Sequence, residues 1–85
     1  MAQFVVSVEV VPRRGLLDPQ GKAVTDALHA LGFSTVTRVA IGRHLVIDVA
    51  ADSEAKARAM VQQMCEQLLA NPVTEDFHIS AVSAA

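Results

Sequence analysis

The residues best suited to chemistry by type and spacing are Gly15 and Gly21-Lys22, at a predicted junction between a strand and a helix. Glycines followed by a lysine are typical of loops that hold phosphate groups. Here the spacing is one residue too long, and Ala23 stands where a serine or threonine would hold magnesium. Asp18 can instead cap the free N–H groups of the helix, and Pro19 suits its first position. We therefore expect either a plain helix cap or a docking place where other atoms approach Gly21 closely.

The histidines and the cysteine do not form a recognisable reactive set. His29, His44 and His78 lie in three different predicted elements, and none pairs with another at the spacing of metal ligands. We expect solvated or interface histidines and no metal site. Cys65 falls on the apolar stripe of a predicted helix, where a buried structural thiol is favoured over a nucleophile. A single cysteine excludes an internal disulfide and suits a reducing compartment.

Two pairs of charged neighbours remain as candidates. Glu75-Asp76 could act as an acid/base pair, but adjacent side chains of an extended segment point in opposite directions, so a solvated turn is favoured. Arg13-Arg14 could clamp an anion, although a solvated loop is the simpler interpretation. No nucleophile, base and oxyanion site come together in the sequence. The chain is not predicted to be catalytic by itself.

The hydrophobic pattern predicts six elements that position these residues. Apolar residues alternate over 3–12 as in a half-buried strand, and over 19–31 they take helical spacing until Gly32. Two β-rich runs, 35–41 and 44–50, are joined by Gly42-Arg43 as in a hairpin. A second helix begins at Asp52 or Ser53 and ends at Asn71-Pro72. The predicted buried stripe of this helix is Ala57, Val61, Met64, Cys65 and Leu68. A last strand follows, with Phe77, Ile79 and Ala81 on one face.

The resulting order is β-α-β-β-α-β within one domain, residues 1–85. Two helices that cover one face of a mostly antiparallel sheet form an α+β two-layer sandwich, as in ferredoxin-like folds. The opposite face is predicted to mix apolar and polar residues, which is typical of a sheet that meets a second copy of itself. We therefore expect the sheet to be completed or covered by dimerisation. The residues predicted on that face are Val5, Val11, Ala40, Val46 and Val82 with Ser7, Glu9, Arg38, Asp48 and Ser80.

Composition limits the possible partners. Hydrophobic residues make up 52% of the chain and charged ones 19%, which is more apolar material than a small core can hide. The net charge is −2, with no basic stripe and few aromatic residues, so nucleic-acid binding is not expected. No apolar run approaches the ~20 residues that span a bilayer, and the N-terminus does not resemble a signal peptide. A cytoplasmic protein without a membrane segment is predicted.

Two strings of the sequence resemble a known family. The first is Gly15-Leu16-Leu17-Asp18-Pro19-Gln20-Gly21-Lys22-Ala23-Val24, and the second is Leu68-Leu69-Ala70-Asn71-Pro72-Val73-Thr74-Glu75-Asp76-Phe77. Together they resemble the PurS family, the small S subunit of phosphoribosylformylglycinamidine synthase, over nearly the whole chain. The resemblance departs at the hairpin, where Ala40 and His44 replace longer polar or basic residues.

The resemblance implies a non-catalytic subunit of an ATP- and glutamine-dependent ligase of de novo purine biosynthesis. It implies a homodimer or tetramer that bridges a large ligase subunit and a glutaminase subunit and supports ammonia transfer between them. ATP and magnesium would be used by the ligase subunit, with no cofactor on this chain. The alternative hypothesis is an ACT-like regulatory module that binds an amino acid at a dimer interface, because such modules share the element order and a Gly-Leu-Leu near the first helix.

Residues for partner contact are proposed from the surface groups that the fold does not obviously need and from the structural residues beside them. We expect the start of the first helix and the end of the second to dock partner subunits. The candidates are Arg13, Arg14, Gly15, Asp18, Pro19, Gln20, Gly21, Lys22, Asn71, Pro72, Glu75 and Asp76.

Overall fold

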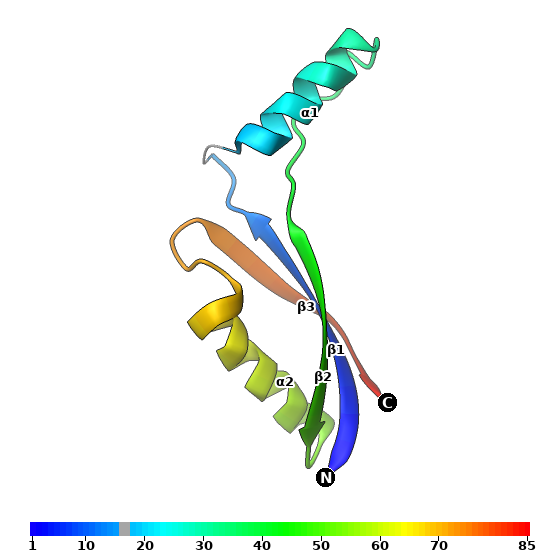
Figure 1. Cartoon of the computed structure of the whole chain (residues 1–85), viewed down its shortest axis with the longest axis vertical. Helices are drawn as coiled ribbons and strands as arrows, with labels where there is room; N and C mark the ends of the chain where they lie inside the picture. Colours follow the sequence, from blue (N-terminus) through cyan, green and yellow to red (C-terminus); the bar gives the residue numbers. More distant parts are fainter. Residues whose placement is uncertain (16–17) are drawn as a thin grey trace.

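The computed structural model describes residues 1–15 and 18–85 (Figure 1). Leu16 and Leu17 of the first string lie outside the described residues. The elements in chain order are β1 (Ala2–Pro12), α1 (Pro19–Ala30), β2 (Arg43–Ala51), α2 (Glu54–Met64), the π-helical segment η1 (Cys65–Leu69) and β3 (Glu75–Ala84).

One antiparallel sheet, in the strand order β2-β1-β3, carries the core. The alternation predicted for the first strand is confirmed, since Val6, Val8 and Val10 are fully buried on one face of the central strand. Helix α2 and the start of η1 cover this face and contribute Val61 and Cys65 respectively, which are also fully buried. The predicted α+β class with an antiparallel sheet is therefore confirmed.

Helix α2 begins at one of the two cap residues that the sequence offers, Asp52 or Ser53. The π-helical segment η1 that continues it changes which leucine is buried. The hydroxyl of Ser53 accepts a hydrogen bond from the Lys56 N–H at 3.2 Å, so Ser53 is the cap. Leu68 was expected in the buried stripe and is instead 82% exposed. The π turn of η1 holds more residues than an α turn and rotates the residues after it. Leu69 therefore packs against the core in place of Leu68.

An irregularity in β3 corrects the predicted faces of the last strand. The register moves from Val8↔Ile79 to Ser7↔Ala81, which leaves Ser80 as an extra residue. Alternation therefore reverses beyond the bulge. Ala81 is exposed rather than buried, and Val82, expected on the opposite face, packs against the core.

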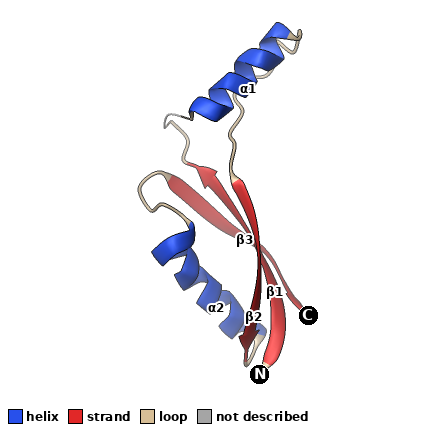
Figure 2. Cartoon of the chain, viewed as in Figure 1, coloured by secondary structure: helices blue, strands red, loops and turns tan. Residues whose placement is uncertain are grey.

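The expectation that both helices cover one face of the sheet is wrong for α1. Figure 2 shows α1 projecting beyond the end of the sheet, whereas α2 lies along it. Gly21 is the only buried residue of α1. The helix still ends as predicted, because Gly32 has a φ of 99° and the N–H of Phe33 donates to the Leu28 carbonyl at 2.9 Å, a Schellman ending.

The strand expected at 35–41 is not formed, so the sheet has three strands among the described residues. Residues 36–42, which we call the return segment, lead straight into β2, and no hairpin forms at Gly42-Arg43. The reason is that α1 takes the backbone groups of this segment. The Val39 N–H donates to the Thr25 hydroxyl at 3.1 Å, and the Val36 carbonyl accepts from the His29 ring at 2.6 Å. We call residues 18–42 the α1 arm.

The arm makes the chain elongated. Its radius of gyration is 16.4 Å and its extents are 52 × 25 × 14 Å, whereas a compact chain of this length has a radius of gyration of about 12 Å. The chain exposes 5771 Å², compared with about 4,900 Å² for a compact protein of its mass. Apolar residues remain on this surface, among them Leu31, which is 74% exposed, and Phe33, which is 57% exposed.

Candidate partner-docking site

The start of α1 has the cap that the sequence predicts. Pro19 occupies the first turn, and the Asp18 carboxylate accepts the Gly21 N–H at 3.1 Å. The same carboxylate accepts the Ile41 N–H of the return segment, also at 3.1 Å. These two N–H groups, that of Gly21 first, hold the pKa of Asp18 below its ordinary value. Asp18 thus links the start of α1 to the end of the return segment through hydrogen bonds.

The close approach expected at Gly21 also exists, and the group that approaches is the chain's own backbone. A Cβ on Gly21 would lie 2.1 Å from the Val39 carbonyl oxygen and 2.5 Å from the Asp18 carboxylate. Thr25 completes this contact, because its hydroxyl donates to the Gly21 carbonyl at 2.8 Å. The cap is therefore confirmed, and the space above Gly21 is taken by the chain's own backbone; docking of another molecule at this junction stays a prediction.

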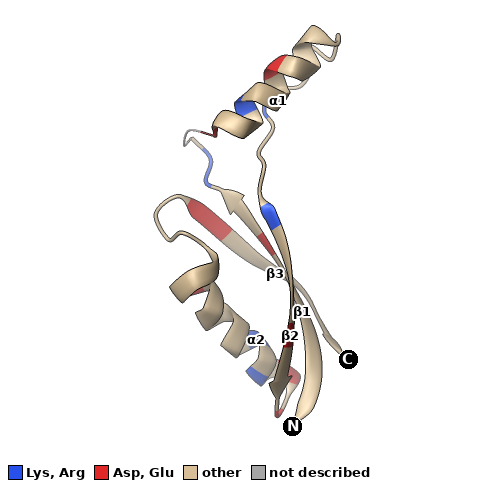
Figure 3. Cartoon of the chain, viewed as in Figure 1, with Lys and Arg blue, Asp and Glu red and all other residues tan. Residues whose placement is uncertain are grey.

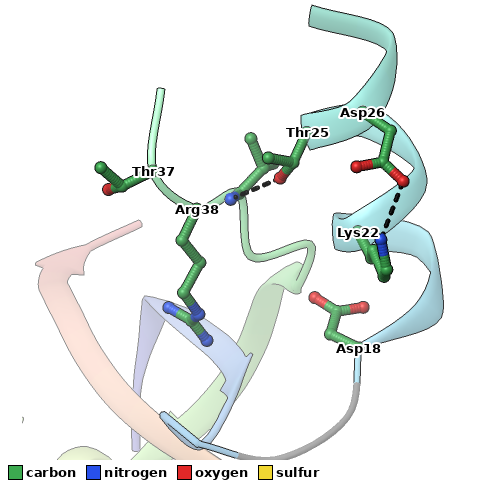
Figure 4. Close-up of a pocket in the computed structure, with 7 residues that line it drawn as sticks. Asp18, Lys22, Thr25, Asp26, Thr37 and Arg38 are labelled. Carbon is green, nitrogen blue, oxygen red and sulfur yellow. Dashed lines mark hydrogen bonds and ion pairs between the residues drawn. The ribbon is translucent and has the colours of Figure 1, made fainter. Parts of the chain in front are cut away.

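A shallow pocket of about 360 Å³ lies between α1 and the return segment (Figure 4). Two acids and two bases line it, so it has no net charge. Lys22 and Asp26 pair across one helical turn at 2.9 Å. The carboxylate of Asp18 already binds the N–H group that a phosphate would need, which supports the cap over a phosphate loop. The lining residues are Asp18, Lys22, Thr25, Asp26, Thr37, Arg38 and Val39.

The second group of candidates surrounds the turn between η1 and β3, and the fold brings Arg13 to it. The Arg13 side chain pairs with Asp76 at 3.2 Å, and its backbone N–H donates to the Thr74 carbonyl at 2.9 Å. Arg14 is exposed, and Gly15 beside it has a φ of 83°, as expected of a glycine that turns the chain after a strand. Gln20 and Pro72 are exposed as well. Arg13 therefore belongs with the turn rather than with the start of α1.

Glu75 has an internal contact that the sequence does not reveal. Its carboxylate accepts from the Arg43 guanidinium and from the Asn71 N–H, both at 2.8 Å. The same guanidinium nitrogen donates to the Leu69 carbonyl at 3.0 Å at the end of η1. Arg43 thus joins β2 to the turn. No local pattern marks a contact between residues so far apart in sequence.

On the uncovered face of the sheet, the structure brings together polar residues that the sequence separates. Glu9 pairs across strands with His44 and with His78. Its carboxylate accepts from His44 Nδ1 at 2.8 Å and from the Ser80 hydroxyl at 3.2 Å. The Ser80 hydroxyl is the main cause that lowers the pKa of Glu9. Residues 1–15 and 18–85 contain no cluster of three or more ligands able to hold a metal ion.

The remaining residues do not form a further reactive group. Burial raises the pKa of the Cys65 thiol, with a smaller contribution from Glu66, which agrees with the structural role predicted for it. Figure 3 shows acidic and basic residues interspersed along the molecule. Within the described part of the chain, no helix has the length and apolar character needed to cross a membrane.

The Asp18 cap predicts a pH dependence of the arm. Because folding lowers the pKa of this carboxyl, its stabilising effect is present above the ordinary aspartate pKa of about 3.9 and is lost as the pH falls through the folded value. We expect hydrogen exchange of the Ile41 amide to accelerate, relative to the intrinsic rate, below about pH 4. Asp18→Asn keeps an oxygen acceptor at every pH and should abolish this acid step. An Ile41 amide equally protected on both sides of the transition would contradict the cap.

Comparisons with known proteins place this geometry among related chains. The family model described as "PurS: Phosphoribosylformylglycinamidine (FGAM) synthase" matches residues 5–83. A phosphoribosylformylglycinamidine synthase subunit PurS from Synechocystis sp. is 40% identical over 80 residues, which cover 92% of this chain and 80% of that protein.

Solved structures agree with the sequence matches. The structure of Thermus thermophilus PurS superposes with a TM-score of 0.82 at 33% identity and covers 95% of each chain. A chain in the structure of PurLQS from Thermotoga maritima superposes with a TM-score of 0.82 at 28% identity and covers 100% of each chain. The long arm is therefore part of a fold that these related proteins share.

Proposed function

Because this chain belongs to the PurS family of phosphoribosylformylglycinamidine synthase, we propose that it is the non-catalytic small subunit of that synthase. The complete enzyme converts formylglycinamide ribonucleotide, ATP and glutamine into formylglycinamidine ribonucleotide, ADP, phosphate and glutamate in purine biosynthesis. The family match favours this role over an ACT-like amino-acid sensor.

Within the synthase, we assign to this chain a bridging role. It joins the large ligase subunit, which uses ATP and magnesium, to the glutaminase subunit, and it acts as a homodimer or tetramer in the cytoplasm. The observation that carries this proposal is the elongated shape, with exposed apolar residues on the arm. Ammonia that escapes into water is protonated and ceases to be a nucleophile, so a subunit that closes its route has kinetic value.

Two groups of residues are proposed to dock the partner subunits. The start group is Asp18, Pro19, Gln20, Gly21 and Lys22, beside Arg14 and Gly15. The turn group is Asn71, Pro72, Glu75 and Asp76 together with Arg13. Glu75 holds the turn in shape by accepting from Arg43, and the Asn71 side chain does so by accepting the Val73 N–H. Lys22, Gln20 and Asp76 are therefore better probes of docking. The side chains of Lys22 and Asp76 are 69% and 64% exposed.

The test is assembly with the purified ligase and glutaminase subunits in the presence of ADP and glutamine. We expect Gln20→Ala/Lys22→Glu, or Asp76→Lys, to weaken assembly by roughly tenfold or more, as loss of a central contact does. Arg58→Glu on α2 and Asp52→Lys are matched charge reversals outside both groups and should assemble normally.

Activity measurements separate docking from damage to the reaction. Glutamine-dependent synthesis should fall in step with assembly, while synthesis from added ammonia should persist because the ligase centre lies on another subunit. If both docking variants retain full assembly and glutamine-dependent activity, the assignment of these residues is wrong. If the wild-type chain does not assemble with the two subunits at all, the proposed function is wrong.

A further inference from the structure

Arg43 is not among the candidate residues, yet it lies between the two docking groups. It begins β2 directly after the return segment, in which the Ile41 N–H donates to the Asp18 carboxylate of the start group at 3.1 Å. Its guanidinium donates to the Glu75 carboxylate of the turn group at 2.8 Å and to the Leu69 carbonyl at 3.0 Å. We call the contact of this guanidinium with Leu69 and Glu75 the Arg43 clamp. One short piece of backbone thus connects the start group with the turn group.

Gly42, between Ile41 and Arg43, cannot absorb a movement of the return segment. Its backbone lies so close to the Val10 carbonyl that there is no space for a methyl group. Val10 belongs to the central strand, which has a neighbouring strand on each side. Val10 also pairs with Arg43, so the Arg43 side chain leaves the sheet on the buried face of Val10, towards η1. Gly42 therefore acts as a fixed pivot, and a tilt of the backbone at Ile41 reappears at Arg43.

The Arg43 clamp holds the shape of the turn group. The Glu75 carboxylate that accepts from Arg43 also accepts the Asn71 N–H at 2.8 Å, and the Glu75 N–H donates to the Asn71 carbonyl at 2.9 Å. The Glu75 side chain is only 23% exposed, so without Arg43 its carboxylate loses a counter-charge and must turn towards water. The Asn71 N–H then loses its acceptor. Opening of the clamp therefore loosens the turn.

The exposure of Arg43 allows the clamp to open. In the closed state the guanidinium binds Leu69 and Glu75, and in the open state it lies in water. The Arg43 side chain is 56% exposed, and ion pairs at the surface contribute little to stability, so neither state is strongly favoured. A ligand shifts such an equilibrium when it binds one state better than the other. Contacts that fix Ile41, or that order the turn, therefore favour the closed state.

We propose that the Arg43 clamp couples the two docking groups, so that a partner subunit bound at one group raises the affinity of the other group for its own partner. This inference rests on the proposed function and specifies how its two docking groups act together. A partner that orders the start group fixes Ile41 and closes the clamp, so the turn group is ordered before its partner arrives. By thermodynamic linkage, the same factor acts in the opposite direction. Arg43 is thus a positioning residue, which acts through Ile41 and Glu75.

Hydrogen exchange in the purified chain alone tests the link without the partner subunits. Asp18→Ala releases the Ile41 N–H, and we expect exchange of the Asn71 amide to accelerate about fivefold or more, the lower end of typical couplings. Arg43→Met keeps an unbranched side chain but removes the donors, so the Asn71 amide should already exchange fast and Asp18→Ala should add nothing.

Two further variants are the controls for this cycle. One guanidinium nitrogen makes both bonds of the clamp, so the single ammonium of Arg43→Lys can replace it and should preserve the response of the Asn71 amide to Asp18→Ala. His44→Met breaks the neighbouring pair of β2, between His44 and Glu9 on the other face of the sheet, and should preserve the response as well.

A second measurement determines the affinity of the chain for the glutaminase subunit with and without the ligase subunit, in ADP and glutamine. We expect the ligase subunit to raise the affinity of the wild-type chain about fivefold or more. Arg43→Met should lose most of this increase, whereas Arg43→Lys and His44→Met should keep it. A purely structural role of Arg43 would instead lower both affinities by one factor and leave their ratio unchanged.

The outcomes separate the coupling from the proposed function. An Arg43→Met chain with the wild-type ratio of affinities would overturn the coupling, and so would a wild-type Asn71 amide that does not respond to Asp18→Ala. Normal assembly of the synthase would in either case leave the proposed function standing. If the wild-type chain does not assemble with the other subunits, the proposed function is wrong, and the hydrogen exchange of the chain alone still decides whether Arg43 links the two groups.

Discussion

Gly21→Ala should weaken the α1 arm, although alanine is the better helix former. By propensity alone, the substitution would stabilise a helix by up to about 1 kcal/mol. Here the added methyl group would lie 2.1 Å from the Val39 carbonyl oxygen, which the return segment holds against α1. Overpacking of this kind typically costs about 1–3 kcal/mol, so the clash outweighs the propensity. The return segment must then separate from the helix.

Hydrogen exchange of the Val39 and Ile41 amides measures this effect directly. Both amides donate to side chains of the arm, and we expect their protection in Gly21→Ala to fall by roughly tenfold or more. Ala23→Gly in the same turn isolates the propensity term and should lower helix stability by about 1 kcal/mol without exposing Val39 selectively. A Gly21→Ala protein that is more stable than wild type, with Val39 fully protected, would show that the close contact is absent.

Gly42→Ala should destabilise the joint between the arm and the sheet. Gly42 has no positive φ, so the requirement for glycine is one of space and not of backbone conformation. A Cβ would lie 2.1 Å from the carbonyl oxygen of Val10, in the central strand, and 3.0 Å from the Val11 side chain. The central strand is held on both sides and cannot move. We expect a loss of about 1–3 kcal/mol in the free energy of unfolding.

Thermal denaturation tests the joint, with a shift of roughly 4–8 °C for each kcal/mol in a domain of this size. The double variant Gly42→Ala/Val11→Ala is the informative control. It removes the side chain that a methyl group on residue 42 would meet but leaves the Val10 backbone in place, so it should not restore stability. Rescue by Val11→Ala would mean that the side chain, and not the central strand, is the obstacle.

Features decided within a few residues could be predicted from the sequence. The Asp18 and Ser53 caps, the Schellman ending at Gly32 and the alternation of β1 all depend on neighbours along the chain. The position of α1 could not be predicted. An apolar stripe requires a cover, but periodicity does not identify the surface that supplies it. The prediction of a strand at 35–41 was wrong for the same reason. β-branched residues favour an extended backbone but do not determine which strand it pairs with.

The candidate site was predicted as a set of residues and not as an arrangement. Arg13 lies in an exposed loop, as expected, but its pairing with Asp76 of β3 was not predicted. Glu75 was chosen as a surface group, yet it organises the turn through Arg43. Contacts of this kind depend on strand register, and the extra residue in β3 shows how one position changes which side chains meet. Residue type alone could therefore identify the charged candidates but not their partners.

The π turn of η1 has a consequence for the evolution of this helix. A wide turn of five residues, Cys65–Leu69, accommodates what amounts to a single-residue insertion between the buried part of α2 and the following loop. Removing one residue between Cys65 and Leu68 would return the segment to α-helical phase and leave Leu69 on the buried face and Leu68 on the exposed one. A change in chain length by one residue would thus make this helix regular without moving the leucine that packs on the core.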